Sequence, residues 1–275
     1  MKTRSQSVVV DGKHSKPAKV LSGVPQGTVL GPLLFLLHIN DLPSVVTSTV
    51  RLFADDCLLY RPVRCVSDQV ALKSDLSALQ RWGETWGMRF NAGKCHIMQL
   101  HRGQSQVYFY SLCGQVLTLV EQAKYLGVLL ANDLSWSPHV ASVTGKASSA
   151  LGFLRRNLRR CPAELKERAY VAYVRSILDY ASPIWDPHLK GDISSLERVN
   201  RRAARYVSGD YQRHSSVSSM MNNLGWSSLE DRRRDTRLAL LYKIVNGDVA
   251  VSSEDIHLQL TDSRLKSHQK KTLQT

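Results

Sequence analysis

The chain has 275 residues, of which 43% are hydrophobic and 22% charged, which is typical of a folded globular protein and excludes a largely disordered one. Its 37 lysines and arginines against 23 acids give a formal net charge of +14, which favours a polyanionic partner, nucleic acid before an anionic membrane surface. No apolar stretch is long enough to span a bilayer and no signal peptide is recognisable, so we expect an intracellular protein, nuclear or cytoplasmic.

The N-terminal segment predicts a hairpin followed by a helix. Three valines at 8–10 lead into Asp11 and Gly12, and a second strand candidate follows at 19–21. Asp-Gly adopts the positive φ angles that a tight turn requires, so we expect the two runs to pair. Residues 28–42 are apolar almost all round, which is typical of a helix enclosed by protein.

A glycine-rich stretch, SGVPQGTVLGPLLF, leads into this helix. Its glycines and prolines give a backbone that can approach a flat or phosphate-bearing ligand closely, with the amide of Gln26 available to position it. The same letters are equally consistent with a tight packing turn.

The stretch RLFADDCLLY, residues 51–60, places two adjacent acids between apolar runs that we expect to be buried. It predicts a strand hairpin with Asp55 and Asp56 at the bend. Two such carboxylates can chelate a divalent cation, because the metal offsets the cost of taking unpaired charges out of water. The alternative is a surface turn with two solvated acids.

Asp68 is predicted to cap a helix that ends at Gly87. The apolar residues of this helix recur every three or four positions, at Leu72, Leu76, Leu79, Trp82 and Trp86. Four short strand candidates follow, with the sequences MRFN, CHIMQL, VYFYSL and KYLGVLL. This alternation predicts a first domain of the α/β or α+β class over residues 1–131.

From residue 132 to residue 250 the periodicity is helical, which predicts an all-α region. A helix is expected to begin at Ser137. Its apolar stripe consists of Val140, Val143, Ala147, Leu151, Leu154 and Leu158. Pro162 opens a second helix, with a stripe formed by Leu165, Ala169, Ala172 and Ile177.

Two further helices and a tail complete the chain. One helix covers residues 192–207, and a capping box from Ser227 to Glu230 begins the other, which ends at Gly247. The apolar residues of this last helix are Leu238, Leu241 and Ile244. Residues 251–275 are predicted to form a basic, flexible tail.

The helical region is strongly basic. Four arginines of the helix at 192–207 fall on the side opposite its apolar stripe: Arg198, Arg201, Arg202 and Arg205. Such a face is either simply solvated or in contact with nucleic-acid phosphates, and the net charge of the chain favours phosphate contact. The histidines and cysteines show no spacing typical of a zinc site, and the tryptophans are expected in the core rather than as base-stacking platforms.

Taken together, SGVPQG with LGPLLF, then INDL at 39–42, then FADD at 53–56 resemble the reverse transcriptase of non-LTR (LINE-type) retrotransposons. Downstream, WGETWGMRFNAGKC resembles the next motif of that family and KYLGVLLANDLSW resembles its primer grip. The segments LGFLRRNLRR and DYASPIWDP resemble the region after the palm in these polymerases. The resemblance implies a right-hand polymerase architecture lacking fingers, with a partial palm over 1–131 and a helical thumb or connection region over 132–250.

The resemblance also implies roles for particular residues. Asp55 would be the principal metal ligand, with Asp56 beside it, for Mg²⁺ (or Mn²⁺). The nucleotide and template would be contacted by Gly23, Pro25, Gln26 and Gly27. Lys94 would lie near the triphosphate. The implied reaction is addition of dNTPs to a DNA primer on an RNA template by two-metal phosphoryl transfer, an RNA-directed DNA polymerase activity.

One part of that pattern is missing. Two metals need a further carboxylate from a separate strand, which the family places before the glycine-rich motif. Here the only acid before Gly23 is Asp11, which belongs to the hairpin turn, and Asp41 at the helix end is a poor geometric substitute. We therefore expect a truncated copy that is inactive alone. The alternatives are a non-catalytic remnant that binds a template–primer-like duplex, and an unselected fragment that folds poorly because its palm has lost a strand.

Overall fold

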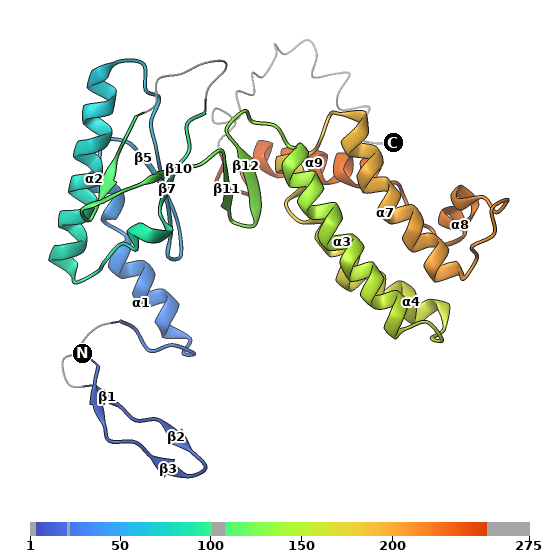
Figure 1. Cartoon of the computed structure of the whole chain (residues 1–275), viewed down its shortest axis with the longest axis horizontal. Helices are drawn as coiled ribbons and strands as arrows, with labels where there is room; N and C mark the ends of the chain where they lie inside the picture. Colours follow the sequence, from blue (N-terminus) through green and yellow to red (C-terminus); the bar gives the residue numbers. More distant parts are fainter. Residues whose placement is uncertain (1–3, 21–22, 101–107, 252–275) are drawn as a thin grey trace. The chain divides into compact units, whose positions relative to one another are not determined.

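The computed structural model describes residues 4–20, 23–100 and 108–251, a mixture of helices and small sheets (Figure 1). The chain divides into two compact units between Glu121 and Gln122. All strand pairs of the described residues form two-stranded sheets. Each unit has its own buried core, so each is described by itself.

The first unit begins with a long hairpin. Its strands are β1 (Ser5–Gln6), β2 (Val9–Val10), β3 (Lys13–His14) and β4 (Ala18–Lys19). The predicted turn is confirmed, since Asp11 and Gly12 have φ angles of 49° and 75°. The strand predicted to pair with residues 8–10 was wrong. A two-residue turn pairs Val10 with Lys13, and Lys19 pairs instead with Ser5; Leu21 lies outside the described residues.

Helix α1 (Leu30–Ile39) forms where predicted and is followed by a 3₁₀ turn, η1 (Leu42–Val45). The expectation that protein encloses the helix was wrong. Among its residues only Gly31 and Ile39 are buried, while Leu37 is 67% exposed and the preceding Val29 94%. An apolar sequence therefore forms the helix, but nothing in this unit covers most of its surface.

Strands β5 (Thr49–Phe53) and β6 (Asp56–Tyr60) form the predicted hairpin, and helix α2 (Val66–Trp86) follows. Asp68 does not occupy the cap position itself. The cap is Cys65, and the Asp68 carboxylate accepts hydrogen bonds from the backbone N–H groups of Arg64 and Cys65. Gly87 ends the helix in the left-handed conformation, as predicted.

The core of this part lies between α1, β5 and α2. Its buried members are Ile39, Leu42, Val50, Leu79 and Trp82. The remaining elements of the unit are η2 (Ala92–Lys94), β7 (His96–Ile97), β8 (Ser111–Leu112), β9 (Gln115–Val116) and β10 (Thr118–Leu119). MRFN is therefore not a strand, and CHIMQL and VYFYSL contribute two-residue strands only, with Val107 outside the described residues. KYLGVLL was predicted as one strand but forms a hairpin in the second unit.

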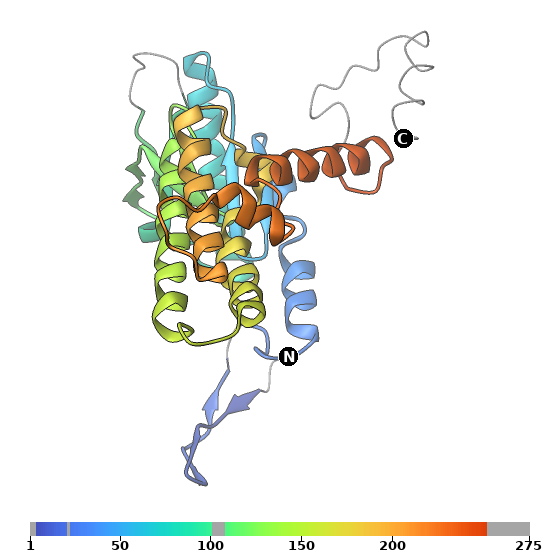
Figure 2. The same ribbon diagram turned by 90° about the vertical axis from the view of Figure 1, so that its right-hand side faces the viewer.

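The second unit consists of that hairpin and a helical bundle. Its strands are β11 (Gln122–Tyr125) and β12 (Val128–Ala131). Its helices are α3 (Ser137–Asn157), α4 (Ala163–Tyr170), a π-helical turn η3 (Val171–Arg175), α5 (Ser176–Asp179), α6 (Ser182–Trp185), α7 (Lys190–Ser208), α8 (Val217–Asn223) and α9 (Leu229–Val245). Helices α3 and α7 run side by side, as both ribbon views show (Figures 1 and 2).

The stripe predicted for α3 is confirmed for Val140, Val143, Ala147, Leu151 and Leu154, which are all buried, while Leu158 at the C-cap is partly buried against the same core. The stripe predicted after Pro162 was right for only two of its four residues. Ala169 is buried and Ile177 partly buried as predicted, but Leu165 and Ala172 are exposed, and the chain also buries Tyr170, Val174 and Leu178. The π-helical turn adds a residue to one turn and shifts the register of the side chains after Tyr170, such as Ala172, but it does not account for Leu165, which precedes it.

Helix α9 begins one residue later than predicted. Its cap is Ser228, whose hydroxyl oxygen accepts from the Asp231 N–H and whose O–H donates to the Asp231 carboxylate. Of the predicted stripe only Ile244 is buried, whereas Leu238 and Leu241 are exposed. Figure 2 shows this helix, drawn in red, extending away from α3 and α7; it contacts α5, α6 and α7. No helix within the described ranges is long and apolar enough to cross a membrane.

Candidate active site and nucleic-acid interface

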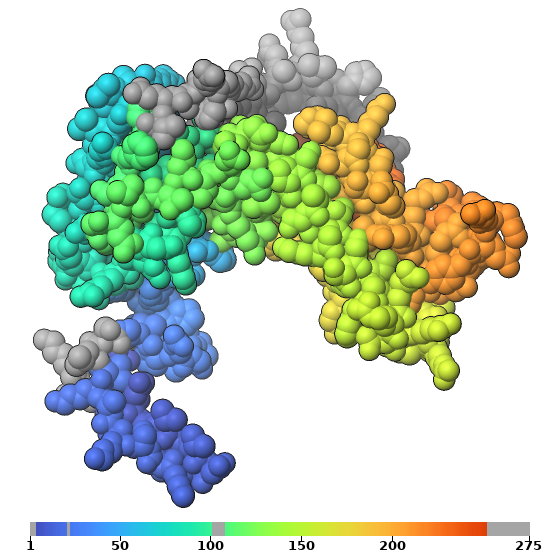
Figure 3. All heavy atoms as spheres, in the orientation of Figure 1, coloured from blue at the N-terminus to red at the C-terminus, as the bar shows by residue number. Residues whose placement is uncertain are grey.

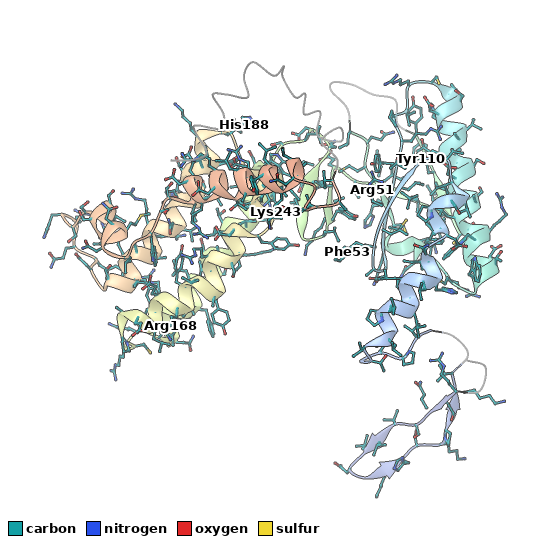
Figure 4. The ribbon with its side chains drawn as sticks, turned by 180° about the vertical axis from the view of Figure 1, so that it is seen from behind. Arg51, Phe53, Tyr110, Arg168, His188 and Lys243 are labelled. Atoms are coloured by element: carbon teal, nitrogen blue, oxygen red, sulfur yellow. The ribbon has the colours of Figure 1, made fainter. Side chains whose placement is uncertain are left out.

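The paired acids lie at the tight turn between β5 and β6. Phe53 pairs with Asp56 across the hairpin, which leaves Ala54 and Asp55 as the two turn residues, with Ala54 at a φ of 50°. Both carboxylates are exposed, and Phe53 beside them is 62% exposed (Figure 4). The expectation of buried flanks was therefore only partly right, because Leu52, Leu58 and Leu59 are partly buried whereas Phe53 and Tyr60 are exposed.

Such a turn can hold at most part of a metal site. No cluster of three or more His, Cys, Asp or Glu residues suited to a metal occurs within residues 4–20, 23–100 and 108–251. Magnesium commonly binds through one or two carboxylates and completes its octahedral shell with waters and substrate phosphates. Asp55 and Asp56 therefore fit one such ion when phosphate oxygens are supplied, and they do not by themselves fit a two-metal site.

The glycine-rich loop has an outer and an inner part. Gly23, Gln26 and Gly27 are exposed, and Pro25 is partly buried. On the inner side, the Pro25 carbonyl accepts a hydrogen bond from Thr28 Oγ1, which in turn accepts from the Gly31 N–H; both distances are 3.0 Å. A Cβ at Gly31 would lie 2.5 Å from that carbonyl oxygen, so close packing requires glycine there. Packing thus explains Gly31 and leaves the exposed positions for a ligand.

Two other acids of this unit serve the fold. Asp41 accepts a 3.1 Å hydrogen bond from Trp82 Nε1. Asp75, which no sequence motif marks, is 4% exposed and accepts bonds from the backbone N–H and hydroxyl groups of both Thr47 and Ser48. The sequence gives no signal for this contact, because Asp75 lies 27 positions after Ser48 and no motif spacing links the two residues. Lys94 is exposed in η2.

In the second unit, the four predicted arginines differ in environment. Arg198 and Arg201 are exposed on α7, and Arg202 donates a 2.7 Å bond to the Ser148 hydroxyl of α3. Arg205 is partly buried and donates to three backbone carbonyls of the following segment, those of Asp210, Gln212 and Ser215. This guanidinium therefore holds the chain after α7 against the end of the helix.

A basic cavity lies beside that segment. It has a volume of about 900 Å³ and is lined by Gly152, Arg155, Arg156, Arg159, Lys166, Tyr206, Gly209 and Tyr211, which we call the basic pocket. Yellow-green atoms of α3 and α4 meet orange atoms of α7 and its following segment on the face drawn in Figure 3. The excess of cations in this region is visible in the sequence, but the enclosure of one cavity by three separate segments is not.

Paired exposed carboxylates on a hairpin turn, together with a basic helical unit, are features expected of a protein that acts on nucleic acid. Comparison with known proteins is more specific. The family described as "Reverse transcriptase (RNA-dependent DNA polymerase)" matches residues 2–130, a range that includes the glycine-rich loop and the Asp55–Asp56 turn. The first half of the chain is thus similar to a reverse transcriptase domain.

Curated relatives extend the likeness into the helical unit. The "RNA-directed DNA polymerase from mobile element jockey" of Drosophila funebris is 26% identical over 218 residues, 75% of this chain and 24% of the relative. The "Probable RNA-directed DNA polymerase from transposon BS" of Drosophila melanogaster is 29% identical over 223 residues, with the same two shares. A "Retrovirus-related Pol polyprotein from type-1 retrotransposable element R1" of Nasonia vitripennis is 24% identical over 221 residues, 74% of this chain and 65% of the relative. The chain spans about a quarter of the length of the first two.

Proposed function

We propose that this chain is the palm and thumb portion of a retrotransposon RNA-directed DNA polymerase. The palm corresponds to residues 1–131 and the thumb to 132–250. The observation that carries the proposal is the Asp55–Asp56 turn, which presents two carboxylates on a strand hairpin inside the range that matches reverse transcriptases. Adjacent carboxylates on a rigid hairpin are suited to bind the metal of phosphoryl transfer.

Within this proposal, Asp55 and Asp56 hold Mg²⁺ (or Mn²⁺), which when bound supplies charge neutralisation for the transferred phosphoryl group. Exposed Gln26 and Gly27, with Gly23 and Pro25, position the nucleotide and the template base. The Lys94 ammonium attracts the triphosphate of the incoming dNTP. The exposed guanidinium groups of Arg198 and Arg201 contact phosphates of the RNA template and DNA primer.

These 275 residues are expected to bind template and primer without extending the primer at a substantial rate. The two carboxylates lack a third ligand within the described residues, so phosphate alignment suffers, and misplacement of reacting groups by about 1 Å costs on the order of a hundredfold in rate. The same observation favours the second candidate, a non-catalytic remnant that binds nucleic acid. Catalysis separates the two candidates, because both predict salt-sensitive binding.

Primer extension on purified full chain tests the proposal. The reaction contains an RNA template, an annealed DNA primer, dNTPs and either Mg²⁺ or Mn²⁺, and the control is the Asp55→Asn/Asp56→Asn variant. Weak extension that the double variant abolishes supports a polymerase whose metal site lacks a ligand. No extension by either protein, with template–primer binding retained, supports the non-catalytic candidate. Robust extension that survives the double variant contradicts any role for this turn.

A further inference from the structure

The basic pocket carries charges that the fold itself does not neutralise. It is lined by four cations, Arg155, Arg156, Arg159 and Lys166, and no acid is among its lining residues. None of the four takes part in the ion pairs of the described residues, which involve other arginines. Cations near the C-terminal end of a helix such as α3 complement its dipole, but that effect does not require four of them around one cavity. Their mutual repulsion favours a bound anion.

The pocket also contains two tyrosines in different environments. Tyr206 is buried at the base, where its hydroxyl donates to the Leu154 carbonyl and Lys166 Nζ lies 5.7 Å from its ring centroid. Tyr211 is 56% exposed at the rim, with the Arg155 guanidinium 5.7 Å from its ring centroid. Arg205 fixes this rim through the Asp210 and Gln212 carbonyls on either side of Tyr211. An exposed ring held beside cations is suited to stack on a nucleobase.

A glycine inside α3 keeps the pocket open. Gly152 lies within this 21-residue helix, where glycine destabilises by about 0.5–1 kcal/mol relative to alanine. A Cβ at this position would meet only the Arg156 guanidinium, at 3.5 Å, so packing does not demand glycine. The absence of a side chain instead leaves room for a ligand to approach the helix beside the cations.

We propose that the basic pocket binds a single strand of nucleic acid. Phosphates contact Arg156, Arg159 and Lys166, and one base stacks on Tyr211. Stacking on a side chain requires an unpaired base, whereas the base faces of a duplex are already covered by their neighbours. The inference goes beyond the proposed function, because this binding needs neither the Asp55–Asp56 turn nor polymerase activity.

Fluorescence anisotropy on the full chain tests this proposal with labelled single-stranded RNA, single-stranded DNA and a blunt duplex of equal length. The charge variant is Arg156→Gln/Arg159→Gln. Its matched control is Arg234→Gln/Lys243→Gln, which removes two exposed cations of α9; Figure 4 shows Lys243 well away from Arg168 of α4. The stacking variant is Tyr211→Ala, with Tyr211→Phe as the ring-preserving control.

The charge variant is expected to lower the slope of log K against log salt for single strands by about 1.4, since each lost phosphate contact removes about 0.7. Tyr211→Ala is expected to weaken single-strand binding about fivefold or more with the slope unchanged, whereas Tyr211→Phe retains it. The single strand, RNA or DNA, that binds with the higher affinity is identified as the natural ligand of the pocket. Equal losses for the charge variant and its control, or equal weakening of duplex and single-strand binding by Tyr211→Ala, would overturn the proposal. Because Tyr211 is exposed, its loss is not expected to impair folding.

Discussion

Two aspartates of the first unit show how environment decides the role of a carboxylate. Asp55 is exposed at a hairpin turn, where its charge is available to a ligand. Asp75 is buried in α2, and its bonds with Thr47 and Ser48 tie that helix to the segment that enters β5. Arg61 adds a 3.7 Å ion pair to Asp75. Asp75 thus stabilises the base of the hairpin that carries Asp55.

Replacing Asp75 by asparagine is expected to lower the free energy of unfolding by about 2–4 kcal/mol, because an amide nitrogen would then face donors and a charged acceptor is lost. Burial alone would raise the pKa of Asp75, but hydrogen bonds from Ser48 and Thr47 outweigh it and lower the pKa. The stabilisation is therefore present above the unfolded pKa of about 3.9 and is lost as the pH falls through the folded pKa.

Urea unfolding at about pH 7 and about pH 3 checks both parts of this prediction, since these values lie on either side of the unfolded pKa. The difference between wild type and Asp75→Asn should narrow at the lower pH. Asp55→Asn serves as control and should change the unfolding free energy by no more than about 0.5 kcal/mol, as an exposed substitution does. A difference that is the same at both pH values would rule out the carboxylate charge as its source.

At the scale of elements, the predictions from sequence succeeded where a long periodic stripe meets a core. Helices α2, α3 and α7 were predicted because their apolar residues recur over several turns. The stripe after Pro162 was only partly right, because a π-helical turn shifts the register of the residues after Tyr170, which periodicity does not reveal. Two-residue strands are too short to produce a pattern. The candidate acids Asp55 and Asp56 and the glycine-rich loop could be found by motif. The basic pocket could not, because it depends on three segments meeting in space.

Helix α1 gives a prediction at this scale. Its exposed leucines include Leu30, Leu33, Leu36 and Leu37, a contiguous apolar surface of the kind that mediates association. The purified chain is therefore expected to self-associate in a concentration-dependent way, and Leu33→Glu/Leu37→Glu should shift it towards monomer. Sedimentation velocity measures this. Leu165→Glu, a single exposed leucine on α4, should leave association unchanged; equal effects of the two variants would show that α1 has no special part.

At the scale of the whole molecule, the described residues of the two units form separate cores. The larger cluster belongs entirely to the helical unit, and two smaller clusters belong to the first unit. In the helical unit, acids of α5 and the α6–α7 connection fasten α9. Arg233, 2% exposed, donates a 2.7 Å bond to Asp186, which also pairs with Arg237. Asp179 pairs with Arg232.

The two units are expected to unfold in two calorimetric transitions, since two-state behaviour holds for single domains. Asp75→Asn should lower the Tm of one transition only. Asp186→Ala should lower the Tm of the other transition. It should reduce the stability of the helical unit by about 3–5 kcal/mol, because it leaves the buried Arg233 guanidinium without its partner. Asp235→Ala, an exposed acid of α9, is the control and should shift neither. One transition moved by both variants would contradict independent cores, and a scan without any cooperative transition would favour a poorly folding fragment.

The contacts of Arg205 have a consequence for how the sequence of this loop can diverge. The guanidinium recognises peptide oxygens, which every amino acid supplies, so residues such as Gln212 can drift without releasing the loop. A single codon change at Arg205 has no such tolerance. Accumulating substitutions should therefore leave the geometry of this rim unchanged until Arg205 itself is replaced.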